Sequence, residues 1–258
     1  MRNENRMWEL RQSATPDTLD LHIYGTVEGD WYNWWGDLQR SETSANHFRQ
    51  ELEKHPNAAQ INVYINSNGG SVFEGTAIYN QLRRHPAHKT VYVDGFACSI
   101  ASVIAMAGDT VVMPRNTMMM VHNMLLGVCG NAAELRKAAD DLDTINAAGR
   151  QAYLTKSNGK ITEEQLIALM DAETWLTAEQ CIAYGLADEY AEADADMTQA
   201  AEQLTASTKN LEQRIKLRQM LNSQLRQLTD VPNLDTNPAP TDGAGEPVNK
   251  LMQLFDRL

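Results

Sequence analysis

The middle of the chain repeats one pattern: a short apolar run, a turn that contains glycine, and then a helix-favouring stretch. Apolar runs at 61–65 and 90–94 are each followed by such a turn and such a stretch. We expect both runs to be strands that are apolar on both faces and covered by helices. The alternation therefore predicts an α/β fold with a mostly parallel sheet.

The alternation extends beyond these two units. Leu19, Leu21 and Ile23 stand at alternate positions, which predicts a first strand at 19–27. The other predicted elements are a helix at 44–54, a helix with Gly75, Ile78 and Leu82 on one apolar face, a helix at 99–108, and strands at 110–114 and 117–123.

Cap residues mark the helices of the next part of the chain. A long helix is predicted from Asn131 to about residue 157, with Asn131 as N-cap and Glu134 as its capping-box partner. A second helix starts at Thr162, and Thr177 caps a third that ends at Gly185. The main domain is predicted to close near residue 190.

The order of these elements divides the chain into four parts. An N-terminal segment covers 1–18, and the main domain covers 19–190. Residues 191–230 are polar, with a leucine stripe that predicts an amphipathic helical extension. Residues 231–258 are rich in proline near their start, and they are interpreted as a disordered linker followed by a short tail.

An aromatic segment with Trp31, Trp34 and Trp35 separates the first strand from the first helix. Clustered aromatic residues mostly serve packing, so these are expected to cover the core or a subunit contact. A docking surface is the alternative.

Charge and cysteine content exclude several classes of protein. The formal net charge is −12, which argues against a nucleic-acid partner. The three cysteines lack metal-ligand spacing and favour a reducing, cytoplasmic setting. The most apolar run, 97–108, is too short to span a membrane, and no secretory signal is expected at the N-terminus.

Three stretches carry residue types that can perform chemistry. Paired glycines in 66–70 let backbone amides face a ligand oxygen, although such a sequence is also an ordinary strand-to-helix turn. In 95–102, Ser99 stands between a strand and a helix, where unpaired amides favour developing negative charge; the alternative is a simple helix cap. His122 stands near the end of the strand 117–123. The elements between Ser99 and His122 can bring the chain back to the edge of the sheet where Ser99 lies. The alternative is that a lone histidine here is a core residue.

In their order and spacing, the blocks 66–70, 95–102 and 120–123 resemble the signature blocks of ClpP, the Clp protease proteolytic subunit family. The similarity runs from about residue 19 to residue 190. It implies the ClpP/crotonase-like fold of repeated β-β-α units. The aromatic segment, the block at 173–180 and the added tail resemble more particularly the ClpP-related head-maturation (prohead) proteases of phages and prophages.

The resemblance implies roles for individual residues. Ser99 is the expected nucleophile, His122 its general base, and the backbone amides of Gly70 and Ile100 the oxyanion hole. Gly69, with Asn123 and Met124, is expected to line the substrate cleft. Asn123 and Met124 depart from the family, which commonly has a polar residue followed by proline there.

The carboxylate that orients the histidine departs from the family as well. The family usually has aspartate four residues before the Ser or Thr that caps the late helix, and Glu173 occupies this position. Asp171, two residues earlier, is the alternative third member of the triad. No metal or cofactor is expected.

The resemblance also implies a homo-oligomeric ring, as a heptamer or as stacked rings, with contacts through 124–130 and 131–157. The expected activity is that of an ATP-independent serine endopeptidase. Scaffold and capsid proteins inside an assembling procapsid in the host cytoplasm are its expected substrates.

The first alternative is a proteolytic subunit that works with a Clp-type ATPase unfoldase. A crotonase-fold acyl-CoA enzyme, a Ser-Lys dyad peptidase and a non-enzymatic ring-forming assembly factor are further alternatives.

Overall fold

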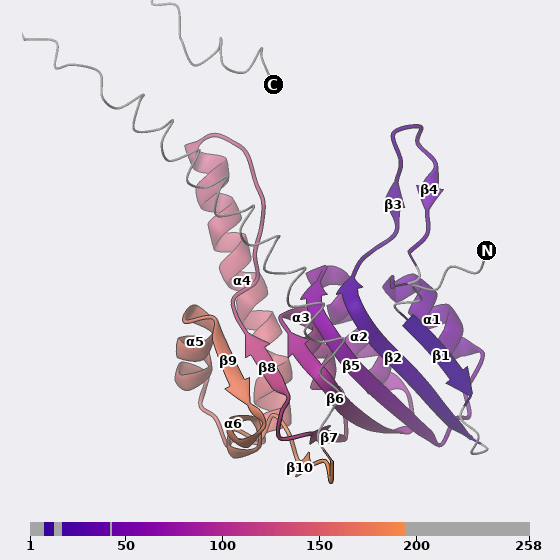
Figure 1. Cartoon of the computed structure of the whole chain (residues 1–258). Coiled ribbons are helices and arrows are strands. Elements are labelled where there is room, and N and C mark those ends of the chain that lie inside the picture. Colours follow the sequence, from indigo (N-terminus) through magenta and orange to yellow (C-terminus); the bar gives the residue numbers. More distant parts are fainter. Residues whose placement is uncertain (1–7, 13–16, 42, 194–258) are drawn as a thin grey trace, which may run out of the picture. The chain divides into compact units, whose positions relative to one another are not determined.

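The computed structural model describes residues 8–12, 17–41 and 43–193, and Figure 1 shows a sheet with helices packed against it. The strands of the sheet are β1 (Trp8–Gln12), β2 (Thr18–Val27), β5 (Gln60–Gly70), β6 (His88–Cys98), β7 (Thr110–Met113), β8 (Met118–Val121), β9 (Thr174–Thr177) and β10 (Glu189–Tyr190). The helices are α1 (Ala45–Glu53), α2 (Val72–Arg84), α3 (Ile100–Ala105), α4 (Ala132–Ser157), α5 (Glu163–Asp171) and α6 (Ala178–Ala183).

The sheet has the strand order β1-β2-β5-β6-β7-β10. All neighbours in this order are parallel except β1, which runs antiparallel to β2. The second half of β6 leaves β7 and pairs in parallel with β8, and β9 adds antiparallel to β8. The α/β prediction is therefore confirmed, and the carboxyl ends of β5, β6 and β8 meet at one edge of the sheet.

Only one face of the central strands is fully buried, which corrects the prediction that both faces are apolar. Leu21, Val63 and Val91 are completely buried. The alternate positions of the same strands, such as Tyr64 and Tyr92, are only half-buried. Each of these strands therefore has one face that is fully buried and one face that is partly exposed to solvent.

The strands β5 and β6 extend further than their apolar runs predict. β5 runs to Gly70 because Gly69 and Gly70 still pair with the end of β2. β6 runs to Cys98, and its last residues pair with β8. The predicted glycine turns are therefore strand, and α3 is shorter than the predicted helix 99–108.

The helix starts lie where the cap residues predict them. Asn131, Thr162 and Thr177 are the N-caps of α4, α5 and α6, and each forms a complete capping box. Gly185 follows α6 with φ +73°. β9 and β1 have no counterpart among the predicted strands.

A two-stranded hairpin of β3 (Trp31–Tyr32) and β4 (Leu38–Gln39) carries the aromatic segment and projects beyond the end of β2 (Figure 1). Trp31, Trp34 and Trp35 are 57%, 95% and 83% exposed, so the expectation that they cover the core is wrong. Asn33 Oδ1 accepts hydrogen bonds from the N–H groups of Trp35 and Asp37, at 3.0 and 2.8 Å. This turn holds the tryptophans in solvent; a subunit contact stays a prediction.

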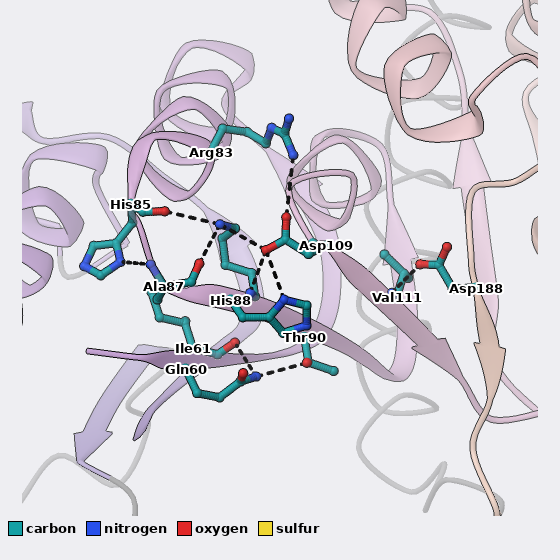
Figure 2. Close-up of polar contacts among 12 residues, drawn as sticks. Gln60, Ile61, Arg83, His85, Ala87, His88, Thr90, Asp109, Val111 and Asp188 are labelled. Atoms are coloured by element: carbon teal, nitrogen blue, oxygen red, sulfur yellow. Dashed lines mark hydrogen bonds and ion pairs between the residues drawn. The ribbon is translucent and has the colours of Figure 1, made fainter. Parts of the chain in front are cut away.

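At the amino ends of β6 and β7, polar contacts gather around Asp109 (Figure 2). Lys89 is almost fully buried, and its Nζ lies 3.1 Å from Asp109 Oδ2 and 2.7 Å from the Ala87 carbonyl oxygen. Lys156 on α4 donates to Asp188 at 2.6 Å. Charged groups thus join α4, β6 and the start of β10 at this edge.

The predicted extension at 191–230 lies outside the described residues apart from its first three, as does the whole of 231–258. Among the described helices, none combines the length and apolar character that crossing a membrane requires.

Candidate active site

The junction between β6 and α3 consists of one residue, Ser99. Its backbone adopts φ +54° and ψ −128°, a conformation that favours glycine and costs on the order of 1–3 kcal/mol elsewhere. The N–H of Ser99 donates to the Met120 carbonyl at 2.9 Å, and its carbonyl accepts from Ser102 N–H at 3.0 Å. The Ser99 side chain makes no capping hydrogen bond, so the simple-cap alternative is wrong. The conformation holds the hydroxyl free of the helix end.

His122 follows the last residue of β8 at the edge where β6 ends. Because Cys98 pairs with Met120, the two strands deliver Ser99 and His122 to the same place. The Nε2 atom of His122 lies 2.7 Å from Ser99 Oγ, which is hydrogen-bond distance, and the imidazole is half-buried. The structure thus brings these two predicted site residues together.

Two glycines at the end of β5 lie close to neighbouring backbone: Gly69 against Ser99 and Gly70 against Val27 of β2. A Cβ at Gly69 would lie 2.7 Å from Ser99 Cβ and 2.8 Å from the Cys98 carbonyl oxygen. Gly70 has φ +146°, and a Cβ there would collide with the Val27 backbone. Only glycine allows β5 to approach both Ser99 and β2 this closely.

The amides around Ser99 differ in their partners. Gly69 N–H donates to Ser67 Oγ at 3.1 Å, so it serves the local turn. Ile100 is the first residue of α3, where an N–H has no partner within the helix. The amide of Gly70, next to Gly69, is the other candidate donor predicted from the sequence.

Cys98 stands directly beside Ser99 and competes with it as a possible nucleophile. Its side chain is buried, and burial raises the pKa of the thiol to about 12. Because the thiolate is the reactive form of cysteine, Cys98 is inert at neutral pH. Of these two neighbouring side chains, the hydroxyl of Ser99 is therefore the candidate nucleophile.

The structure places the two carboxylates differently. Thr174 pairs with Val121 in the antiparallel ladder, so Glu173, one residue before Thr174, stands at the level of His122. Glu173 has a positive φ of +49°, and its side chain is exposed. Asp171 Oδ1 instead accepts a hydrogen bond of 2.7 Å from Asn123 Nδ2. The register of β8 and β9 therefore favours Glu173 as the carboxylate beside His122. Asp171 instead contacts Asn123, the residue that follows His122.

The two residues that follow His122 form hydrogen bonds to two different helices, α5 and α4. Asn123 is held by Asp171, and the N–H of Met124 donates to Asn146 Oδ1 on α4 at 2.8 Å. A Cβ on Gly149 of α4 would collide with the end of the Met124 side chain. Of the predicted cleft residues, Asn123 is therefore held against α5 and Met124 against α4.

Sequence reasoning missed the buried hydroxyls of Ser102 and Tyr153, which lie behind Ser99. Ser102 stands three residues after Ser99 at the start of a helix, a spacing at which serine often bonds back to the chain. Tyr153 gives no local signal because its contact spans 51 residues. The described residues hold no group of three or more His, Cys, Asp or Glu that could bind a metal.

A hydroxyl within hydrogen-bond distance of an imidazole, at a strand-to-helix junction next to a glycine, is the arrangement that nucleophilic catalysis by serine requires. Comparison with known proteins points to the same class, the serine peptidases. The Clp protease family model matches residues 39–194. The chain is 30% identical over 169 residues to the ATP-dependent Clp protease proteolytic subunit 3 of Streptomyces coelicolor, covering 63% of this chain and 76% of that protein.

Two further relatives give the same result. The ATP-dependent Clp protease proteolytic subunit 1 of Streptomyces avermitilis is 31% identical over 169 residues, 63% of this chain and 76% of that protein. The proteolytic subunit of Deinococcus radiodurans is 30% identical over 133 residues, 50% of this chain and 64% of that protein. The chain belongs to the Clp protease family, and it is a ClpP-like serine peptidase.

Proposed function

We propose that this protein is a serine endopeptidase in which Ser99 is the nucleophile and His122 its general base. The 2.7 Å distance between Ser99 Oγ and His122 Nε2 carries the proposal. The inert thiol of Cys98 and the strained backbone of Ser99 support it. An acyl-CoA enzyme of the crotonase type has no use for this serine–histidine pair.

The reaction follows from the geometry. Ser99 Oγ attacks the peptide carbonyl carbon while His122 takes the hydroxyl proton, and the carbonyl π electrons move onto oxygen. The amides of Gly70 and Ile100 stabilise that oxyanion. His122 then protonates the leaving amine as the C–N bond breaks. Water attacks the acyl ester in the same way, and the proton returns from His122 to Ser99.

A carboxylate is needed to orient His122 and to stabilise its cationic form. We assign this role first to Glu173, because the β8–β9 ladder sets it at the level of His122. Asp171 is the alternative, reached through Asn123. Substitution of each carboxylate by its amide separates the two assignments.

We infer a ring of identical subunits, a heptamer or a stack of rings. Support comes from the exposed apolar side chains of Leu125, Leu126 and Val128 in the stretch before α4, with Leu135 on its first turns. Monomers rarely display such a group, and an oligomer contact would cover it.

For the biological setting, we propose cleavage of scaffold and capsid proteins without ATP during phage head maturation in the host cytoplasm. The projecting β3–β4 hairpin and the long C-terminal extension support a substrate-specific role. The competing proposal is a subunit that depends on a Clp-type ATPase; the Streptomyces coelicolor relative is named as a subunit of an ATP-dependent Clp protease.

Hydrolysis of an unfolded polypeptide by the purified full chain, with native mass measurement, tests the proposal. We expect cleavage without ATP, no cleavage by Ser99→Ala, and the same oligomer mass for both proteins. Equal turnover by Ser99→Ala would contradict the assigned nucleophile. Cleavage that requires an added Clp ATPase and ATP would instead select the competing setting.

A further inference from the structure

Two buried hydroxyls lie directly behind the candidate nucleophile. Ser102, on α3, is fully buried, and Tyr153, on α4, is 2% exposed. Ser102 Oγ lies 2.6 Å from the Ser99 carbonyl oxygen and 2.7 Å from Tyr153 Oη. These contacts connect α4 to the junction through Ser102.

The direction of these hydrogen bonds follows from the number of protons. Ser102 Oγ has one hydrogen, and the Ser99 carbonyl at 2.6 Å is a much closer acceptor than the Met120 carbonyl at 3.4 Å. Tyr153 must therefore donate its hydroxyl hydrogen to Ser102. Burial raises the pKa of Tyr153 above its ordinary value, so it keeps this proton at any physiological pH.

The Ser99 carbonyl and the Ile100 N–H belong to one peptide group. A trans peptide is planar, and its C=O and N–H point in opposite directions. The carbonyl receives both the N–H and the hydroxyl of Ser102, at 3.0 and 2.6 Å. Holding the oxygen toward the interior therefore aims the Ile100 N–H the opposite way, away from the buried hydroxyls.

We propose that Ser102, supported by Tyr153, is a positioning residue that orients the Ile100 amide for the oxyanion. The inference rests on the proposed function, because it needs Ile100 to be an oxyanion donor. Ser102 touches no substrate and acts through the Ser99–Ile100 peptide. Without its hydroxyl, that peptide is held by a single weaker donor and can tilt.

The test compares Ser102→Ala with a matched control, Ser157→Ala. Ser157 is equally buried, and its hydroxyl donates to the carbonyl three residues earlier, Leu154, at 2.9 Å. Removing one oxyanion donor costs about 10²–10³-fold in turnover, so a tilted donor is expected to cost roughly 10–100-fold in kcat. KM for a short fluorogenic peptide is expected to stay within about twofold, and Ser157→Ala to keep kcat within the same range.

A peptide aldehyde inhibitor probes the oxyanion directly. Ser99 Oγ bonds to the aldehyde carbon, the carbonyl π electrons move onto its oxygen, and the serine proton passes to His122. We expect Ser102→Ala to weaken aldehyde inhibition by about as much as kcat, since both depend on the oxyanion, and to leave the affinity for the matching peptide alcohol unchanged. Tyr153→Phe is expected to show the same pattern with a smaller loss.

Circular dichroism and melting of each variant check the fold, and Ser102→Cys keeps the side-chain size if Ser102→Ala does not fold. Equal loss of kcat in Ser102→Ala and Ser157→Ala, or equal weakening of the aldehyde and the alcohol, would overturn the positioning role. Failure of the proposed function has another signature: the wild-type chain itself would neither cleave peptides nor form the aldehyde adduct on Ser99.

Discussion

The two ends of the parallel strands are stabilised in different ways. At the carboxyl end, Ser99 adopts a strained backbone conformation, Gly69 and Gly70 allow van der Waals approach, and Ser99 and His122 share a hydrogen bond. At the amino end, Lys89 and Asp109 form a partly buried ion pair. Figure 2 shows the polar contacts around Asp109.

The comparison assigns different tasks to the two ends: the carboxyl end holds the proposed reacting groups, and the amino end holds neighbouring elements together. The carboxyl end carries the side chains proposed to react, Ser99 and His122, whereas the ion pair of Lys89 and Asp109 at the amino end joins secondary-structure elements. Changes to Ser99 or His122 should therefore alter activity more than stability, and changes to the ion pair at the amino end should do the reverse.

The largest expected effect lies at the serine–histidine pair. Ser99→Ala and His122→Ala should each reduce peptide hydrolysis by on the order of 10⁴–10⁶-fold, because either loss disables the proton transfer. The double variant should be no slower than the worse single variant. The test is to measure hydrolysis of one peptide by all variants. The melting temperatures of the variants should lie within a few degrees of wild type. Effects that multiply in the double variant would show that the two residues act independently.

The orienting carboxylate comes next. Glu173→Gln should lower kcat by about 10²–10⁴-fold, because the amide no longer stabilises the imidazolium. Asp171→Asn should lower it by less than about tenfold. Both side chains are exposed, so both variants should fold normally. A larger loss in Asp171→Asn would transfer the role to Asp171.

Two glycines with positive φ, Gly70 and Gly159, differ in how much room surrounds their Cα atoms. Gly70→Ala should destabilise the fold by about 3 kcal/mol and abolish activity, because its Cβ collides with Val27 and its φ is +146°. Gly159→Ala is the matched control: its φ is +81°, but nothing lies within 4 Å, so only the backbone strain of about 1 kcal/mol applies. Denaturant unfolding measures both. Equal losses would mean that close approach does not decide the tolerance at Gly70.

At the amino end, Asp109→Asn should destabilise the protein by about 2 kcal/mol at pH 7 and leave kcat unchanged, because buried Lys89 loses its carboxylate. Partial burial acts to raise the pKa of Asp109, but its hydrogen bonds and charge interaction with Lys89 outweigh this and hold the pKa below its usual value.

The sign of the pH dependence follows from that lowered pKa. The stabilisation by Asp109 is complete above about pH 4 and is lost as pH falls through the lower folded pKa. Melting of wild type and Asp109→Asn should therefore converge in acid. Asp141→Asn, in an exposed pair with Lys137, should change stability by less than about 0.5 kcal/mol. A constant gap down to pH 3 would contradict the assignment.

The smallest effect is expected in the hairpin. Trp34 is 95% exposed, so Trp34→Ala should change the free energy of unfolding by less than about 0.5 kcal/mol. Phe48→Ala, at a side chain that is 1% exposed, should cost about 3–5 kcal/mol. Chemical denaturation of the two variants side by side makes the comparison. A large loss in Trp34→Ala would show that the hairpin supports the fold.

Features that depend on neighbours in sequence were predictable. The capping boxes at Asn131, Thr162 and Thr177 close within three residues, and all three helices begin there. The meeting of Ser99 and His122 was also expected, since parallel strands bring their carboxyl ends to one edge.

Features that depend on distant partners were not predictable. β5 continues through its glycines because β2 offers pairing partners, which no local pattern records. The Tyr153–Ser102 contact joins helices 51 residues apart. The choice between Glu173 and Asp171 depends on loop geometry finer than the spacing of the motif.

The central claim is that His122 activates Ser99. Its most direct test is the site and rate of labelling by a fluorophosphonate, in wild type, His122→Ala and Cys98→Ala. The account predicts a single adduct on Ser99, slowed by at least about 10³-fold in His122→Ala and unchanged in Cys98→Ala. An adduct on another residue, or a Ser99 adduct that forms equally fast without His122, would contradict it.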